Sequence, residues 1–256
     1  KMINLKNLRS KKVGVLGLEK TGLSVIKAVQ QAGGLLICWD DDKHKRDNIT
    51  IDGVTVRDLN NKNIISELDL LVVSPGVPHL YPEAHPIVTM AYELNIRVDN
   101  DIGLFFSNHV QEEYEAFGDP PKIIAITGSN GKSTATALTN HVLSKFFSDV
   151  EMGGNIGKPV LELSPLKEGS IRIIELSSYQ IELAKCLAPN LAAFINFSPD
   201  HLQRHGGLGG YFYAKARLFL ENLTDVSVIN IDTAEGLFLF QRVNTVENKI
   251  IAISSK

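Results

Sequence analysis

The sequence has few of the residues that mark secreted, membrane or metal-rich proteins. It contains only two cysteines, Cys38 and Cys186, which lie in apolar surroundings far apart in the chain. Such a pair indicates core positions in a reducing compartment rather than a disulfide framework or a metal site. No run approaches 18 consecutive apolar residues, and the N-terminus lacks the apolar region of a signal peptide. We therefore expect a cytoplasmic protein that does not bind a membrane.

An excess of positive charge is also missing. The 26 basic and 29 acidic residues give a net charge of −3, so no overall field favours nucleic acid or an anionic membrane. The basic segment KHKR at 43–46 has acidic residues on both sides and is predicted to be a solvated loop. With 256 residues, 44% of them hydrophobic, the chain can bury one large core or two moderate ones.

Short apolar runs alternate with helical periodicity along the chain. This pattern indicates an α/β fold in which parallel sheets are covered by helices on both faces. Helices are predicted at 21–33 and 82–94. The predicted strands fall into two groups, 11–17, 35–40, 69–74 and 96–99, then 122–127, 171–176, 191–197, 226–231 and 249–254.

The polar segment 109–121, which contains Gly-Asp-Pro-Pro, interrupts this rhythm and is predicted to be a linker. It would separate an N-terminal Rossmann-like domain, residues 1–108, from a central P-loop NTPase-like α/β domain, residues 122–256. The last predicted strand lies close to the end of the chain, with no helix after it to cover it. We therefore expect the second domain to be incomplete and the chain to be a fragment.

The segment TGSNGKST, residues 127–134, follows a predicted strand and opens a predicted helix, which is typical of a phosphate-binding loop. Backbone amides around Gly128–Gly131 can form a concave anion nest, and the helix N-terminus would face the phosphates.

The match to G-x-x-x-x-G-K-[ST] is imperfect, because Ile126 stands where the first glycine is expected. The alternative is a glycine-rich turn that only connects a strand to a helix. The predicted ATP-binding residues are Gly128, Ser129, Asn130, Gly131, Lys132, Ser133 and Thr134, with a hydroxyl of Ser133 or Thr134 on Mg²⁺.

Polar residues follow the next two predicted strands, where an α/β sheet places its chemistry. Glu175 ends one strand, and Asp200 and His201 follow the other. An acid beside a phosphate loop is a natural Mg²⁺ ligand, and a histidine there could hold a second ion or a substrate oxygen. Glu175 alone could be a surface charge, and His201 alone a turn residue with satisfied hydrogen bonds. Their place at successive strand ends favours the functional interpretation.

The first predicted strand is followed by GLEKTG, residues 17–22, which departs from the dinucleotide fingerprint G-x-G-x-x-G at Glu19. A glutamate there would crowd and repel a pyrophosphate, which argues against an NAD-dependent dehydrogenase. Asp40 ends the second predicted strand, at the position of a ribose-binding acid. A helix N-terminus that holds the diphosphate of another nucleotide fits this segment better.

Several motifs together resemble the Mur ligases, the ATP-dependent amide ligases of peptidoglycan precursor synthesis. The resemblance runs from about residue 11 to the end of the chain. The motifs of the second half are GSNGKST (128–134), GGNIGKP (153–159), ELSSYQIE (175–182), SPDHLQRHGG (198–207) and YAKARLF (213–219). In the first half, GLEKTGLS, VVSPGVP and DNDIGLFF are similar to the family member that adds D-glutamate to UDP-N-acetylmuramoyl-L-alanine. Gln203 stands where family members often have an acid, which affects local hydrogen bonding.

The resemblance implies roles for individual residues. Lys20 and Thr21 would meet the diphosphate of the UDP-sugar substrate, Asp40 its uridine, and Ser74 and Gly76 would surround it. The muramoyl part would lie near Asn155, Gln180 and His201. The implied catalytic residues are Lys132, Glu175, His201 and Lys215, and the implied ligands of two Mg²⁺ ions are Ser133, Glu175, His201 and Lys215, the last as the carbamylated lysine of this family.

In the implied reaction, the alanyl carboxylate attacks the γ-phosphate of ATP, and the amine of D-glutamate then displaces phosphate from the acyl phosphate. Family members carry a third, C-terminal domain that this sequence does not match. We expect a monomer that binds the UDP-sugar substrate and has little ligase turnover by itself. The alternatives are a sibling ligase, a folylpolyglutamate synthetase, or a non-catalytic UDP-sugar-binding module.

Overall fold

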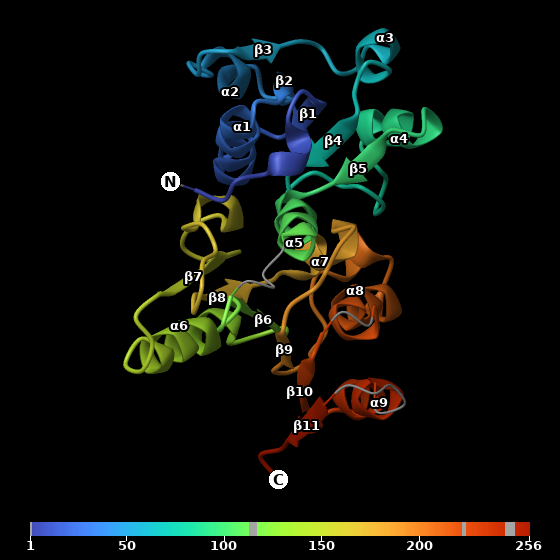
Figure 1. Ribbon diagram of the computed structural model, residues 1–256. Coiled ribbons are helices and arrows are strands. Elements are labelled where there is room, and N and C mark those ends of the chain that lie inside the picture. Colours follow the sequence, from blue (N-terminus) through green and yellow to red (C-terminus); the bar gives the residue numbers. More distant parts are fainter. Residues whose placement is uncertain (1, 113–116, 222–223, 244–248) are drawn as a thin grey trace.

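The computed structural model describes residues 2–112, 117–221, 224–243 and 249–256. These residues form two parallel β-sheets with helices packed around each, so the predicted α/β fold is confirmed (Figure 1). No helix within the described ranges has the length and apolar character that a membrane crossing requires.

The first sheet has the strand order β3-β2-β1-β4-β5, and all its neighbouring strands are parallel. Its central strand β1 has β2 on one side and β4 on the other. After β1, the chain adds β2 and β3 toward one edge of the sheet and then β4 and β5 toward the opposite edge. Such a switch point leaves a crevice at the carboxyl ends of the strands. The elements of this half are η1 (Lys6–Leu8), β1 (Lys12–Leu16), α1 (Lys20–Ala32), β2 (Leu35–Trp39), α2 (Lys43–Asp47), β3 (Val54–Val56), α3 (Lys62–Ile65), β4 (Leu70–Val73), α4 (Pro86–Glu93), β5 (Arg97–Asp99) and α5 (Asp101–Gln111).

The second sheet is also parallel and has the order β11-β10-β9-β6-β8-β7. Strand β6 lies between β8 and β9, so the carboxyl ends of these three strands meet at one edge. The elements of this half are β6 (Lys122–Thr127), α6 (Lys132–Leu143), β7 (Val150–Gly154), η2 (Val160–Glu162), β8 (Ile171–Glu175), α7 (Ser178–Leu183), β9 (Leu191–Phe194), η3 (Leu202–His205), α8 (Leu208–Leu220), β10 (Val226–Asn230), α9 (Ala234–Val243) and β11 (Lys249–Ile253).

All nine predicted strands are present, and the sequence patterns missed the edge strands β3 and β7. Strand β3 has only three residues, and β7 contains Gly153 and Gly154, which have low strand propensity. The helix predicted at 82–94 starts only at Pro86, because proline is well suited to the first helical position and the ring of His85 caps the helix by accepting from the N–H of Ile87 at 3.2 Å.

The prediction of a loop at 43–46 is wrong, because these residues belong to the short helix α2. The side chain of Asp42 caps this helix by accepting from the N–H of His44 at 2.8 Å. Lys45 forms an ion pair of 2.6 Å with Glu19, which lies just before α1. The basic segment is therefore partly neutralised within its own domain.

The two cysteines are unpaired, as predicted. Cys38 is buried in β2, and burial raises the pKa of its thiol to about 12. Cys186 is half-buried.

Helix α5 continues to Gln111, into the segment 109–121 that the sequence predicts to be a linker. Part of this segment, residues 113–116, lies outside the described residues. The domain boundaries therefore stay a prediction.

The largest hydrophobic cluster among the described residues spans both sheets, with α5 and α7 between them (Figure 1). Several hydrogen bonds join the halves, among them those from Ile3 N–H to the Leu161 carbonyl (3.2 Å) and from Asn100 Nδ2 to the Gln180 carbonyl (2.8 Å). The second contact brings the start of α5, directly after β5, close to α7, the helix that follows β8.

Candidate functional site

The segment between β6 and α6 forms a tight glycine turn. Gly131 has a φ of 73°, a left-handed conformation that favours glycine, and it precedes the first helical residue Lys132. At Gly128 a Cβ atom would lie 2.6 Å from Cγ1 of Ile195, so a side chain cannot fit. The turn therefore directs the N-terminus of α6, with its unpaired N–H groups, beyond the carboxyl end of β6.

Asn196, two residues after β9, holds this turn. Its Oδ1 accepts from the N–H groups of Ser129 (3.0 Å) and Asn130 (2.9 Å), and its Nδ2 donates to the Asn130 carbonyl (2.8 Å). Two amides of the expected anion nest thus already have an acceptor. A phosphate would meet the N–H groups from Gly131 into the first turn of α6, where Ser133 and Thr134 are exposed.

Lys132 folds back over the turn, and its Nζ donates to the Ser129 carbonyl at 2.9 Å. The Ser129 hydroxyl is itself engaged, since it donates to the Ser198 carbonyl (2.8 Å) and accepts from the Tyr211 hydroxyl (3.1 Å). The lysine ammonium is therefore held at the turn in a place from which it can reach an anion.

Glu175 lies at the end of β8, next to the phosphate turn, and is 1% exposed. Its Oε1 accepts from Nδ2 of Asn155 at 2.8 Å, whereas its Oε2 is buried without a hydrogen-bond partner. The close approach of β7 and β8 needs Gly154, where a Cβ atom would lie 2.4 Å from the Glu175 carbonyl oxygen. A buried carboxylate oxygen without a partner is costly, and a bound cation would satisfy it.

Lys215 is buried in α8, with 1% of its surface exposed. Its Nζ donates to the Gly128 carbonyl at 2.8 Å and lies 4.8 Å from the ring centre of Tyr211. Burial, assisted by repulsion from Lys132, lowers the pKa of Lys215 to about 7. This amine is thus neutral in a large fraction of molecules at neutral pH, next to the phosphate turn.

His201 has a left-handed backbone, with a φ of 51°, and its side chain is 51% exposed. Its Nε2 lies 3.3 Å from Oδ2 of Asp200, and its ring centre lies 5.2 Å from that of Tyr179. Within the described residues, no three His, Cys, Asp or Glu side chains form a ready metal centre. A cation at this edge would therefore depend on oxygen ligands from a bound nucleotide.

A cavity of about 200 Å³ lies between the two halves of the chain. Six of the eight predicted substrate residues line it, namely Lys20, Thr21, Ser74, Gly76, Asn155 and Gln180. Lys20 also donates across the junction to the Gly157 carbonyl. Since Asn155 donates to Glu175, this cavity is connected to the edge that carries the phosphate turn.

Asp40 lines a second cavity, of about 210 Å³, together with Asp41, Gly76 and His85. The two carboxylate oxygens of Asp40 accept from the N–H groups of Leu18 (2.8 Å) and Asp42 (2.9 Å). Asp40 thus orders the turns after β1 and β2, and Gly76 is shared by both cavities. His201 lines neither of them.

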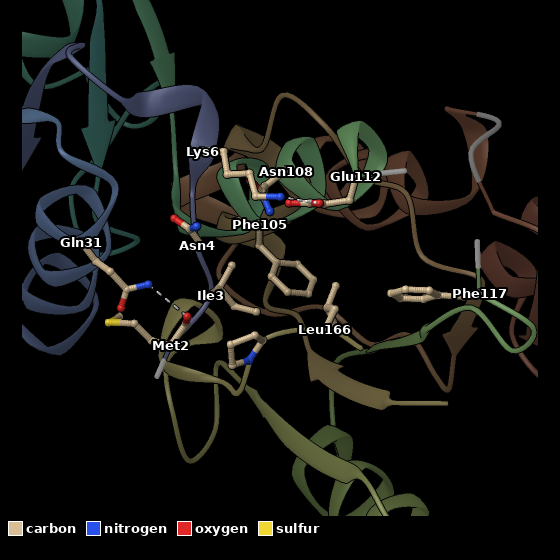
Figure 2. Close-up of a pocket in the computed structure, with 11 residues that line it drawn as sticks. Met2, Ile3, Asn4, Lys6, Gln31, Phe105, Asn108, Glu112, Phe117 and Leu166 are labelled. Carbon is tan, nitrogen blue, oxygen red and sulfur yellow. Dashed lines mark hydrogen bonds and ion pairs between the residues drawn. The ribbon is translucent and has the colours of Figure 1, made fainter. Parts of the chain in front are cut away.

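A larger cavity, of about 610 Å³, contains none of the predicted site residues (Figure 2). It lies beside the N-terminal segment and α5, and apolar side chains such as Ile3, Phe105 and Leu166 point into it. Its two charged lining residues, Lys6 and Glu112, pair with each other at 2.9 Å. It therefore offers no charge for a phosphate.

The sequence analysis did not identify two residues of the phosphate-turn site. Asn196 lies two residues after β9, shortly before the motif at 198–207 that contains His201, and only the later residues were singled out. Tyr211 lies four residues before Lys215 on α8, a spacing that places two side chains on the same face of a helix. That spacing in the sequence could have identified Tyr211 as a neighbour of Lys215.

Comparisons with known proteins agree with this geometry. The chain is 48% identical over 238 residues to a UDP-N-acetylmuramoylalanine–D-glutamate ligase of Ruegeria pomeroyi, and 44% identical over 256 residues to one of Cereibacter sphaeroides. The alignments cover 93% and 99% of this chain but 51% and 55% of the relatives. The chain thus spans about half the length of the curated relatives that it matches.

Among solved structures, a UDP-N-acetylmuramate-alanine ligase from Thermotoga maritima aligns with 90% of this chain and 51% of its own, with a TM-score of 0.50 and 18% identity. This likeness concerns the fold alone. A family model of the Mur ligase middle domain matches residues 126–256, the half that contains the phosphate turn, Glu175 and Lys215. The chain belongs to the Mur ligase family.

Proposed function

We propose that this chain forms the UDP-sugar-binding and ATP-binding parts of a ligase that adds D-glutamate to UDP-N-acetylmuramoyl-L-alanine. One observation carries the proposal. The cavity between the two sheets gathers Lys20, Thr21 and Asn155 in one place, and Asn155 is hydrogen-bonded to Glu175 beside the phosphate turn. The similarity to ligases with this activity supports the choice of substrate.

The first sheet would bind the UDP part of the substrate. Lys20 and Thr21 lie in the first turn of α1, where a helix N-terminus favours an anion, so they would hold the diphosphate. The uridine would occupy the cavity beside Asp40. Ser74 and Gly76 would surround the link between the two, since Gly76 lines both cavities. The muramoyl part would extend toward Asn155 and Gln180.

The second sheet would bind ATP with its phosphates at the N-terminus of α6. The unpartnered Oε2 of Glu175 and the exposed hydroxyl of Ser133 fit a Mg²⁺ ion that also contacts the phosphates. His201, exposed beside Asp200, fits a second ion only if substrate oxygens complete its shell. A bound Mg²⁺ would neutralise negative charge on the phosphate oxygens.

The reaction that fits this arrangement has two steps. An oxygen of the alanyl carboxylate attacks the γ-phosphorus of ATP, and ADP leaves. The amine of D-glutamate then attacks the carbonyl carbon of the acyl phosphate, and phosphate leaves. The first step joins two anions, so Lys132 would act by placing positive charge on the transferred group.

Lys215 is suited to carbamylation. Its neutral amine would attack CO₂, forming a C–N bond and releasing one proton to solvent. The product is an anion, which would replace the ammonium of Lys215 close to Lys132. The repulsion from Lys132 that lowers the pKa of Lys215 would then become attraction. The carbamate would then be available as a ligand for the second Mg²⁺.

The alternative is a non-catalytic UDP-sugar-binding module, which would need the cavity alone. Two buried titratable groups next to the phosphate turn, Glu175 and Lys215, have no evident use in such a module. Their burial favours the ligase.

Calorimetric titration with UDP-N-acetylmuramoyl-L-alanine tests the proposal, with UDP-N-acetylmuramate and NAD as comparators. We expect saturable binding that prefers the alanyl form. Thr21→Ala should weaken it about tenfold, because one hydrogen bond to a charged group contributes about 1.5 kcal/mol or more. Thr89→Ala, at an exposed position of α4, is the matched control and should bind like the wild type. Tighter binding of NAD than of either UDP-sugar would overturn the assignment.

A further inference from the structure

Three titratable side chains form a buried cluster at the junction of the two sheets, and the proposed reaction uses none of them. Glu182 lies on α7, His205 ends η3, and His79 follows β4 in the other half of the chain. Oε1 of Glu182 lies 2.9 Å from Nδ1 of His205, and Oε2 lies 3.1 Å from Nε2 of His79. The contact with His79 is close, but its geometry is not that of a hydrogen bond.

The direction of each hydrogen bond follows from the charge of Glu182. Burial raises the pKa of Glu182, but its contacts with His205 and His79 outweigh this effect and bring the pKa to about 2. An ionised carboxylate only accepts, so Nδ1 of His205 carries a proton and donates. Nε2 of a neutral His205 then accepts from the hydroxyl of Ser178 at 2.9 Å.

The order Ser178, His205, Glu182 is also that of a nucleophile with its base and orienting acid. Ser178 is 2% exposed, and it lines none of the three cavities described above. Its hydroxyl is therefore largely shielded from solvent. The hydrogen bonds serve to fix the orientation of the His205 ring.

The His205 ring supports the segment that carries His201. It stacks on Tyr179, with ring centres 5.1 Å apart and planes 11° apart. The same tyrosine lies 5.2 Å from His201 and 4.8 Å below the guanidinium of Arg204. Tyr179 thus joins the rings of His205 and His201 and the guanidinium of Arg204 in one contact.

The other oxygen of Glu182, Oε2, contacts His79 in the half of the chain that carries the first sheet. His79 is buried and lies three residues after Gly76, which lines both substrate cavities. A second, longer contact runs from Nη1 of Arg204 to the Gly76 carbonyl at 3.4 Å. The loop after β4 is therefore connected to α7 and to the 201–205 segment of the second sheet.

We propose that Glu182 is a positioning residue that joins the Gly76 loop of the first sheet to the His201 segment of the second and so sets the shape of the cavity between them. Its effect on substrate affinity rests on the proposed function, whereas its effect on the relative placement of the sheets does not. Two experiments separate these statements.

The first experiment needs no ligand. Nitroxide labels on Lys62→Cys and Lys145→Cys, both at exposed positions in different halves, report the distance between the halves by pulsed electron paramagnetic resonance, in a Cys186→Ser background. Glu182→Gln should broaden the distance distribution. His79→Ala should do the same while leaving the Ser178–His205–Glu182 hydrogen bonds intact, so it serves if Glu182→Gln does not fold. Unchanged distributions in both variants would overturn the proposal.

The matched control is Glu162→Gln. Glu162 forms another ion pair between the halves, 3.0 Å to Lys27, but both side chains are partly exposed and line neither substrate cavity. Because exposed ion pairs contribute little, this variant should keep the wild-type distance distribution. A broadening equal to that of Glu182→Gln would mean that any contact between the halves has this effect, and would contradict the special role of Glu182.

The second experiment measures binding by calorimetry. Glu182→Gln should weaken UDP-N-acetylmuramoyl-L-alanine about tenfold, in the range of about 10–100-fold seen for partners that orient a ligating group. The affinity for UDP alone should fall less than that for the whole substrate, because Asp40, Lys20 and Thr21, which would hold UDP, all belong to the first half of the chain. Equal weakening of both ligands would indicate a general loss of structure and contradict the proposal. If the wild type binds neither, the proposed function fails, and the distance measurement still decides the role of Glu182.

Discussion

The two sheets carry similar glycine turns at the ends of their central strands, β1 and β6, but different side chains hold them. After β1, the N–H of Leu18 is held by Asp40, which follows β2. After β6, the N–H groups of Ser129 and Asn130 are held by Asn196, which follows β9. In each case the side chain at the end of a neighbouring strand accepts from the turn. One acceptor is an acid and the other is a neutral amide.

The charge of the side chain that holds each turn bears on the ligand proposed for it. An acid next to the turn adds negative charge, which limits how many phosphates can bind and favours the hydroxyl groups of a ribose as hydrogen-bond partners. A neutral amide leaves the field of the α6 N-terminus and Lys132 available for the larger charge of a triphosphate. Glu175 and Lys215 are buried next to the second turn, and under the proposed function they would add metal binding and chemistry there.

The largest effect should come from Lys132→Ala. Removing this charge should weaken MgATP binding by roughly 30-fold or more, since losing one partner of a desolvated charge pair costs about 2 kcal/mol or more. Binding of UDP-N-acetylmuramoyl-L-alanine should not change. Lys20→Ala should show the reverse pattern, and calorimetry with both ligands checks it. If each variant weakened both ligands alike, the two turns would not be separate sites.

A smaller effect, on stability, should come from Gly22→Ala. A Cβ atom there would lie 1.9 Å from the Gly17 carbonyl oxygen, so α1 would have to move away from the turn after β1. Overpacking of this kind costs about 1–3 kcal/mol. Urea denaturation measures the loss. Gly209→Ala in α8 is the control, because nothing lies within 4 Å of its Cβ position and alanine favours a helix. Equal stability of the two variants would show that the first turn does not depend on this close approach.

The smallest expected effect concerns Lys215 and pH. Since burial lowers its pKa from the usual 10.5 to about 7, the unfolded chain binds more protons than the folded one between these values. The free energy of unfolding should therefore rise with pH, by about 1 kcal/mol between pH 7 and pH 8 from this residue. Urea denaturation in CO₂-free buffer measures it, and Lys215→Met should remove this part of the rise. The same rise in both proteins would mean that Lys215 titrates normally.

The predictions from sequence were most accurate where local signals suffice. Apolar runs such as those of β1 and β4 predict buried parallel strands, and glycines before Lys132 predict a turn. The edge strand β7 was missed because its glycines are needed for contact with β8, as at Gly154, and this is a tertiary requirement. The basic segment at 43–46 was misjudged because its helix depends on a cap from Asp42 and its charge is paired with Glu19, from another part of the chain.

The sequence by itself determined the two α/β halves, the phosphate turn and the residue types that a charged substrate needs, because hydrophobic periodicity and turn chemistry act over a few residues. Only the tertiary structure decided which of these residues meet. It left one oxygen of Glu175 without a partner, buried Lys215 against Gly128, and joined His79 to His205 through Glu182. These contacts link residues between 23 and 103 positions apart. Their energies depend on burial and distance, which no local pattern of the chain contains.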